Sequence, residues 1–369
     1  MQLKDSFLLQ NGKYRIIRVL GQGGFGITYL AENTFFDKLV AIKEFFPKDF
    51  CGRDNTSHLI LGTQSNAEIV EKLKARFLKE AKNIAKLNHP GIIKIYDVFE
   101  ENNTAYYVMD YIEGENLNEL VKRNGPLSES KALDYIRKVG DSLDYIHSCN
   151  MTHFDLKPAN IMVRRSDNQS VLIDFGLSRQ YDFHGDATST FMQGVSHGYS
   201  PIEMYNVGAI QSWSPETDVY SLAATMFYLI TGTVPPNACS LRDNQELLYF
   251  PPTVSKSVRS GIINILTVTR AQRAKTVQKF VESLLQCNDT YDESTHIINT
   301  DRSGILSNSL PRKSKNNNQK LSIIGKGIMV FGLIIILIGI GIWLYYDNEL
   351  FLFEINPDNQ ILPIPTVPK

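Results

Sequence analysis

Gly21, Gly23 and Gly26, near the start of the chain, are spaced so that a backbone loop could approach phosphate oxygens. Glycine has no Cβ, so the main chain around it can come close to an anion. The spacing alone is weak evidence, because an ordinary hairpin turn would also explain it. A dinucleotide-binding turn would run directly into a helix, whereas the strand-like run ITYLAEN follows here. The pattern therefore favours a hairpin whose tip lies over a phosphate-bearing ligand.

A lysine that could bind such a ligand ends the next strand-like run, VAIK, at Lys43. A buried ammonium group stays charged only beside an acidic partner. Glu80, in the helical run FLKEAKNIAKL, is the candidate for that partner. We therefore expect the first part of the chain to hold an anionic ligand between a glycine hairpin and a charged lysine.

Two more polar motifs follow: HFDLKPAN at residues 153–160, and DFG at residues 174–176 after the apolar run VLI. With the glycine spacing and VAIK, they occur in the order of eukaryotic-type protein kinases. The sequence therefore resembles a Hanks-type serine/threonine protein kinase, of a bacterial-like kind, over about residues 14–287.

The resemblance implies that the chain binds ATP. Lys43 would grip the α and β phosphates and be held by Glu80. Met109 resembles the gatekeeper of the adenine pocket, and backbone groups of Asp110 and Ile112 would meet the adenine. The ATP-binding residues implied in this way are Gly21, Gln22, Gly23, Gly24, Phe25, Gly26, Thr28, Ala41, Lys43, Met109, Asp110 and Ile112.

The resemblance also implies a transfer of the ATP γ-phosphate to a protein hydroxyl. Asp155 would accept the proton of that hydroxyl, and Lys157 would reach the γ-phosphate. With lysine at this position the loop resembles that of serine/threonine kinases, whereas tyrosine kinases usually differ here. Asn160 and Asp174 would hold two Mg²⁺ ions through oxygen ligands. Catalysis would then depend on Asp155, Lys157, Lys43 and Glu80.

One position in the HFDLKPAN motif departs from the family pattern. Phe154 stands where many kinases carry an arginine that binds a phosphate on the activation segment. A phenyl ring has no donor and no charge, so we expect activity that does not depend strongly on that phosphorylation. Ser196 keeps a hydroxyl where a threonine usually contacts the catalytic acid and lysine. Glu203, in the run SPIE, is predicted to pair with Arg273.

The elements that must position these residues fall into two parts. Residues 14–112 are rich in β-branched and aromatic runs, with one helix over about 67–87, and beyond 127 the apolar period becomes helical. The fold class expected is α+β, a bilobal protein-kinase fold with a small β-rich lobe (14–112) and a larger helical lobe (113–287). The polar stretch around 47–66 is predicted to be a surface insertion.

An uncharged apolar run, residues 327–346, predicts a membrane anchor. As a helix it would span roughly 30 Å, the thickness of the bilayer hydrocarbon. Basic residues precede it and acidic residues follow it, and positive flanks stay cytoplasmic. We therefore expect a single-pass cell-membrane protein with a polar, basic linker (288–320), a span with its basic flank (321–346) and a short outer tail (347–369).

The helix of this span also carries glycines at every seventh position, 325, 332 and 339. Glycines on one face let two helices approach closely, so a homodimer through the span stays open. The net charge of −1 gives no reason to expect a nucleic-acid partner. Four widely separated cysteines predict reduced, buried thiols.

Two alternatives to an active kinase remain. Phe154 and the run SPIE would suit a catalytically weak pseudokinase that acts as a scaffold at the membrane. A small-molecule kinase of related fold is the other alternative. The long segment between Asp174 and Glu203 favours protein substrates instead.

Overall fold

An antiparallel six-stranded sheet forms the first part of the chain, in the order β1-β2-β3-β4-β8-β7. The computed structural model describes residues 2–63, 66–175, 195–205, 214–244, 247–267 and 269–285. The strands of the sheet are β1 (Leu8–Leu9), β2 (Tyr14–Gln22), β3 (Gly26–Asn33), β4 (Lys38–Phe45), β7 (Ile95–Glu101) and β8 (Thr104–Asp110). A separate hairpin, β5 (Cys51–Arg53) and β6 (Leu59–Leu61), and helix α1 (Ala67–Ile84) complete this part.

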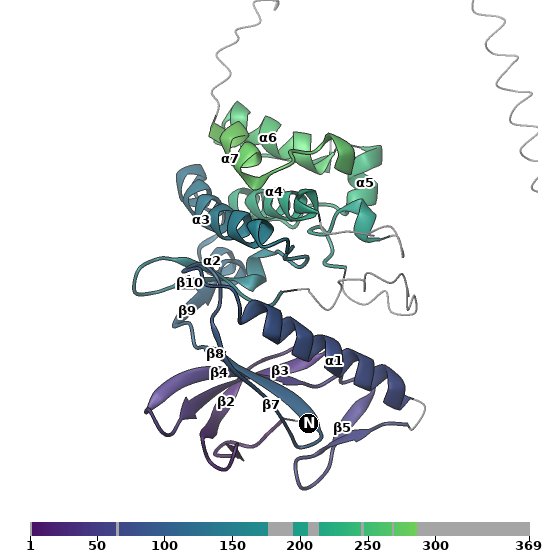
Figure 1. Ribbon diagram of the computed structural model, residues 1–369. Helices are drawn as coiled ribbons and strands as arrows, with labels where there is room; N and C mark the ends of the chain where they lie inside the picture. The colour runs from purple at the N-terminus through teal and green to yellow at the C-terminus, as the bar shows by residue number, and fades with distance from the viewer. Residues whose placement is uncertain are drawn as a thin grey trace, which may run out of the picture. The chain divides into compact units, whose positions relative to one another are not determined.

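The two faces of the sheet have different partners. Successive residues of a strand point to opposite faces. Phe45 of β4 and Tyr107 of β8 meet Phe77 of α1, with ring centroids 5.7 and 5.0 Å apart. Lys43, two residues before Phe45, therefore lies on the face that α1 covers, and Glu44 lies on the other face. Figure 1 shows α1 running along this side of the sheet.

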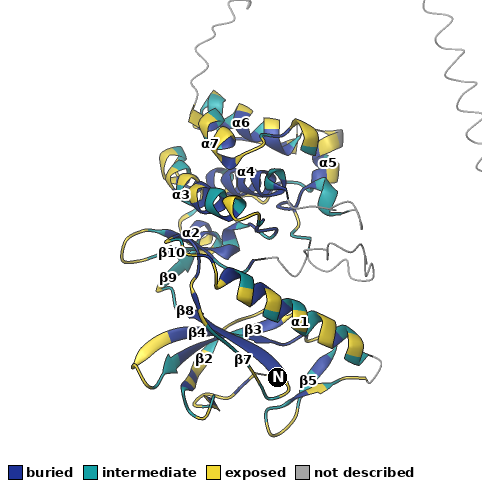
Figure 2. Ribbon diagram, in the orientation of Figure 1, coloured by how far each residue is buried: buried dark blue, intermediate teal, exposed yellow. Residues whose placement is uncertain are grey.

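The second part of the chain is helical and is built around a buried helix, α4 (Pro215–Thr231). Pro215 occupies the first turn of α4, and Gly232 ends the helix in a left-handed conformation with φ of 71°. The helices that pack on α4 are α3 (Glu129–Ser148), α6 (Lys256–Leu266) and α7 (Val277–Leu285). Figure 2 shows α4 almost entirely buried between them.

Short elements complete this part and carry the polar motifs. They are β9 (Gly114–Asn116), α2 (Leu117–Asn124), β10 (Ile161–Arg164), β11 (Ser170–Leu172) and α5 (Ala238–Asp243), with 3₁₀ turns at Pro158–Asn160, Ile202–Met204 and Arg270–Gln272. The antiparallel pair β10–β11 lies between the two motifs: HFDLKPAN comes directly before β10, and Asp174 follows β11. This hairpin brings the two motifs side by side.

The bilobal fold predicted from the sequence is confirmed, as is the helix that begins at Ala67. The stretch at 47–66 is less superficial than predicted, because Cys51 and Leu59 of the β5–β6 hairpin are buried in the core. The prediction of buried thiols was wrong for Cys149 and Cys239, which are exposed. The exact lobe and linker boundaries stay predictions.

Within the described ranges, no helix is both long enough and apolar enough to cross a membrane. The linker at 288–320, the span with its basic flank at 321–346 and the tail at 347–369 lie outside the described residues.

Candidate active site

Asp155 is the centre of a network of polar contacts in the loop between α3 and β10. Its Oδ1 accepts a hydrogen bond from Ser196 Oγ at 2.7 Å, and its Oδ2 lies 2.9 Å from Lys157 Nζ. Asn160 Nδ2 donates to Asp155 Oδ2 at 3.0 Å and to the Asp155 carbonyl at 2.8 Å. Lys157 Nζ also contacts Ser196 Oγ at 3.1 Å. The carboxylate is therefore held in one orientation, with 15% of the side chain exposed.

Asp218 of α4 fixes the backbone of this loop. Its carboxylate is fully buried and accepts the His153 N–H at 2.8 Å and the Phe154 N–H at 3.0 Å. His147 Nε2 lies 2.9 Å from the same carboxylate. Phe154 has φ of 63°, in the left-handed region that a bulky residue rarely adopts. Two charge-assisted hydrogen bonds to one buried acid hold the loop in this strained shape.

His153 connects this loop to the DFG motif. Its ring stacks on the ring of Phe175, with centroids 4.5 Å apart. Burial lowers the pKa of His153 below its usual value, although Asp218 and Asp155 act in the opposite direction. The imidazole is therefore neutral at pH 7 and serves as a packing surface that orients Phe175 and, with it, Asp174.

Lys43 and Asp174 form an ion pair between the two lobes, with Nζ and Oδ1 2.6 Å apart. Burial acts to lower the pKa of Lys43, but attraction to Asp174, Tyr107 and Glu80 outweighs it and holds that pKa well above its usual range. Burial likewise acts to raise the pKa of Asp174, but Lys43 outweighs it and lowers that pKa. Both groups are therefore charged at neutral pH.

Glu80 of α1 is buried and is one of the charges that stabilise the ammonium of Lys43. Glu80 therefore acts electrostatically on Lys43, and its role as the catalytic partner of that lysine stays a prediction. The ion pair with Asp174 was not predicted, since the two residues lie 131 positions apart and neither motif indicates the other. Lys43 therefore has two acidic neighbours, one on each lobe.

The glycines of the loop at residues 21–26, called the glycine-rich loop below, have two separate reasons to be glycine. A Cβ on Gly26 would lie 2.8 Å from the carbonyl oxygen of Glu44, so β3 and β4 can approach there only without a side chain. A Cβ on Gly21 or Gly24 would meet nothing within 4 Å, and one on Gly23 would meet only the Gly26 carbonyl at 3.9 Å. The first half of the loop therefore faces open space, where a ligand can approach its backbone.

Several residues predicted to bind ATP share one face of the sheet. Thr28 pairs with Lys43 across β3 and β4, and Ala41 pairs with Met109 across β4 and β8. Because cross-strand partners and alternate residues share a face, these four side chains point the same way. This is also the face that α1 covers. The predicted nucleotide-binding set is thus brought together by strand register.

Asp110 follows Met109 at the end of β8. Its N–H donates to the Lys94 carbonyl at 3.0 Å, so this amide is already used within the protein. Its side chain contacts Tyr96 and Lys38 on the surface of the sheet. An adenine can therefore meet Asp110 only through the carbonyl, while Ile112, two residues further, packs partly against the core.

Asn160 and Asp174, the residues predicted to hold Mg²⁺, can supply some of the oxygen ligands of the ion but not all of them. Asn160 Nδ2 donates to the carbonyls of Asp155 and Asp174, which leaves its amide oxygen as the atom able to ligate a cation. In the part of the chain that the structure describes, no three His, Cys, Asp or Glu residues form a complete metal site. Mg²⁺ commonly takes one or two protein oxygens together with phosphate and water, so the donor set suits it.

The contacts predicted for Ser196 and for Glu203 are both present. Ser196 contacts both Asp155 and Lys157, and Glu203 forms an ion pair with Arg273, whose Nη2 lies 3.1 Å from Oε2. Tyr107, which lies 5.9 Å from Lys43 Nζ by its ring centroid, was missed. It stands in the run AYYVMDYI, where nothing distinguishes a residue beside Lys43 from any other buried aromatic.

The comparisons with known proteins agree with this geometry. Residues 14–292 match the protein kinase domain family. Serine/threonine-protein kinase B of Synechocystis sp. is 28% identical over 74% of this chain and 46% of its own length. Serine/threonine-protein kinase PknA of Nostoc sp. is 30% identical over 75% and 47%. The chain thus spans about half the length of these curated relatives.

Solved structures show the same fold. A structure described as the apo form of PpkA-294 is 25% identical, with a TM-score of 0.66, and covers 77% of this chain and 99% of that one. The kinase domain of PknI from Mycobacterium tuberculosis is 22% identical, with a TM-score of 0.56 over 77% of this chain and 98% of that one, which shows the fold alone. Sequence match, fold and side-chain arrangement lead to one conclusion: the chain belongs to the protein kinase family.

Proposed function

We propose that the chain is a serine/threonine protein kinase that transfers the γ-phosphate of ATP to protein hydroxyls. The observation that carries the proposal is the convergence of Lys43, Asp174, Asn160 and Asp155 from three separate stretches of sequence. The names of the relatives, several of them serine/threonine-protein kinases, support the acceptor class.

Asp155 is the proposed catalytic base. Its carboxylate takes the proton of the substrate hydroxyl as that oxygen attacks the γ-phosphorus. Ser196 and Lys157 fix its orientation, and Lys157 Nζ offers positive charge to the phosphoryl group that moves. The loop is shaped before any substrate arrives, so little reorganisation is left for the reaction itself.

Lys43 is the proposed phosphate-binding cation on the small lobe. Its raised pKa keeps the ammonium protonated at neutral pH, so it presents a full charge to the α and β phosphates. Asn160 and Asp174 would hold Mg²⁺, which offsets the charge that builds on the transferred group. Glu80 and Asp174 keep Lys43 in reach from both lobes.

The proposal is tested by supplying the full-length chain, in detergent, with Mg²⁺, labelled ATP and casein as acceptor. Label on serine and threonine of casein is the expected result. A pseudokinase would bind nucleotide and transfer nothing, and label on tyrosine alone would contradict the acceptor class. The small-molecule kinase alternative predicts that no protein is labelled.

Activation-segment phosphorylation is expected to matter little, because Phe154 gives the segment no cation to bind. Phe154 is buried, and its N–H is held by Asp218 whether or not a phosphate is present. The segment's hydroxyls Thr188, Ser189 and Thr190 lie outside the described residues. Replacing all three by alanine should change kcat by less than about threefold, because no phosphate-binding fork is lost.

The comparison for this triple variant is the wild-type chain after phosphatase treatment, assayed at saturating ATP. Both should run at nearly the untreated rate. A drop of about 100-fold, close to 3 kcal/mol of activation barrier, would show that another basic residue takes the place of the missing arginine. Arg179, the first arginine after the DFG motif, is the candidate for that role.

We also propose that residues 327–346 anchor the protein in the cell membrane, with the kinase part cytoplasmic. The support is the uncharged length of the run and the basic flank before it. Protease added to sealed inside-out vesicles should remove the kinase part, and its protection there would contradict the orientation. A homodimer through the glycines of the span is tested by crosslinking at several protein-to-lipid ratios.

A further inference from the structure

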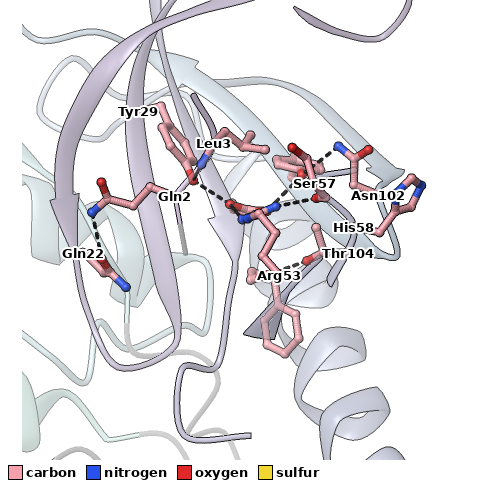
Figure 3. A network of polar contacts seen from close by, with 12 residues as sticks. Gln2, Leu3, Gln22, Tyr29, Arg53, Ser57, His58, Asn102 and Thr104 are labelled. Atoms are coloured by element: carbon pink, nitrogen blue, oxygen red, sulfur yellow. Dashed lines mark hydrogen bonds and ion pairs between the residues drawn. The ribbon is translucent and has the colours of Figure 1, made fainter. Parts of the chain in front are cut away.

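Residues 46–61, which follow β4 and include the β5–β6 hairpin, are fastened to the outer face of the sheet by a buried polar network. Arg53 Nη2 lies 2.8 and 2.7 Å from the two carboxylate oxygens of Glu44. Glu44 is fully buried, and Arg53 keeps only 5% of its side chain exposed. Figure 3 shows Arg53 reaching from the hairpin into this network.

Glu44 is also the acceptor for two tyrosines of neighbouring strands. Tyr29 OH donates to its Oε2 at 2.8 Å, and Tyr106 OH donates to its Oε1 at 2.9 Å. Arg53 Nη1 donates to the Ser57 carbonyl at 2.7 Å, which ties the turn of the hairpin to the same cluster. A buried charge is stable only when its partners are complete. If the hairpin left the sheet, Glu44 would lose the Arg53 guanidinium that pairs with its carboxylate.

The first residues of this segment hold the tip of the glycine-rich loop. Phe46 N–H donates to the Phe25 carbonyl at 2.8 Å, and Lys48 N–H donates to the Gly24 carbonyl at 3.2 Å. Gly23 N–H closes the loop on itself through the Gly26 carbonyl at 2.9 Å. Because the loop is rich in glycine, its backbone has unusual conformational freedom, which binding of a ligand would have to remove. Two outside hydrogen bonds remove part of that freedom in advance.

We propose that residues 46–61 position the glycine-rich loop over the nucleotide phosphates, with the Arg53–Glu44 pair as the anchor of the segment and the Lys48 N–H as its tie. The inference rests on the proposed function, since it takes ATP as the ligand of the loop. Lys48 and Arg53 are positioning residues, because they act through Gly24 and its neighbours. Changing them should leave the binding residues on the sheet in place. Preorganisation of this kind tightens binding by lowering its entropic cost.

Lys48 allows a test that changes a single N–H. Phe50 N–H donates to the Pro47 carbonyl at 2.9 Å, which makes Lys48 the second residue of a turn. Proline is favoured at that turn position, so Lys48→Pro suits the local shape while removing the donor to Gly24. Lys48→Ala is the matched control, because it removes the same side chain and keeps the N–H.

The readout is binding of ADP and of adenosine to the full-length chain in detergent with Mg²⁺, measured by calorimetry. In Lys48→Pro the Kd for ADP should rise by about three- to tenfold, the value of one lost hydrogen bond. The Kd for adenosine, which has no phosphates, should stay unchanged, and KM for ATP should rise while kcat changes little. Lys48→Ala should match the wild type in all of these.

The outcomes separate the two proposals. If the wild type binds ADP and Lys48→Pro binds it equally well, the positioning role is wrong and the kinase assignment stands. Equal weakening of ADP and adenosine would overturn the inference as well, because a general loss of structure explains it. Failure of the wild type to bind ADP would overturn both.

The anchor is tested by Arg53→Met against Arg53→Lys. Methionine keeps most of the side-chain length but leaves the buried Glu44 without its cation, whereas lysine keeps a cation in reach. Arg53→Met should therefore show the same selective loss of ADP affinity, with Arg53→Lys closer to the wild type. Wild-type ADP affinity in a folded Arg53→Met, checked by thermal unfolding, would overturn the anchor, and if this variant does not fold the Lys48 pair still decides.

Discussion

Replacing Asp155 by asparagine is expected to lower kcat by about 10²- to 10⁴-fold, the usual contribution of a general base. The change keeps the size of the side chain and its hydrogen-bonding reach, but removes the carboxylate that Ser196 and Lys157 orient. The Kd for ADP should stay within about threefold of wild type, because Asp155 binds the acceptor hydroxyl and not the nucleotide. Initial rates at saturating ATP and calorimetric ADP binding measure the two effects.

Asp167→Asn is the control for this change. Asp167 is an exposed carboxylate in the turn between β10 and β11, where it accepts the Gln169 N–H. The same chemical substitution there should leave kcat unaltered. If Asp155→Asn transfers phosphate as fast as Asp167→Asn, the base is another residue and the proposed mechanism is wrong.

Replacing Arg273 by methionine is expected to lower the free energy of unfolding by about 3–5 kcal/mol, the cost of breaking a buried ion pair from one side. Arg273 and Glu203 keep only 1% and 10% of their side chains exposed. The guanidinium also lies over the ring of Tyr220 of α4, 4.9 Å from its centroid, so the cation links two parts of the helical lobe. Its loss leaves the largely buried Glu203 side chain without its ion-pair partner.

Lys275→Met gives the matched comparison two residues away. Lys275 pairs with Glu216 at 3.0 Å, but 54% of the lysine side chain is exposed. Exposed pairs contribute at most about 1 kcal/mol, so this variant should unfold nearly like the wild type. Urea unfolding followed by circular dichroism measures both variants. Equal midpoints for the two would show that the Arg273 pair is not buried as the structure has it.

The residues within one motif could be predicted from the sequence because the chain between them is short. Asp155, Lys157 and Asn160 lie in a single loop, and few backbone paths exist that do not bring them together. Ser196 and Glu203 were also anticipated, but only through the family resemblance, since nothing in their immediate sequence indicates Asp155 or Arg273. That Ala41 and Lys43 share a face of β4 follows from alternation once the strand is identified, whereas the register that aligns Thr28 and Met109 with them comes from the structure.

The pairs that the sequence did not indicate depend on how distant elements pack. Lys43 meets Asp174 only because the packing of the chain brings β4 beside the residues that follow β11. Arg53, in the polar run CGRDNTSH, has the surroundings of a solvated side chain. It is buried because Glu44 lies on the sheet face opposite Lys43 and needs a cation there. A single sequence gives the period of a strand but not which face a later hairpin will cover.

The most direct measurement is a crystal structure of the chain with Mg²⁺ and a non-hydrolysable ATP analogue. We expect oxygens of Asn160 and Asp174 about 2.1 Å from Mg²⁺, the usual ligand distance. Lys43 Nζ should lie within hydrogen-bond reach of the α and β phosphates, beneath the glycine-rich loop. A nucleotide bound elsewhere, or none bound at saturating concentration, would contradict the account.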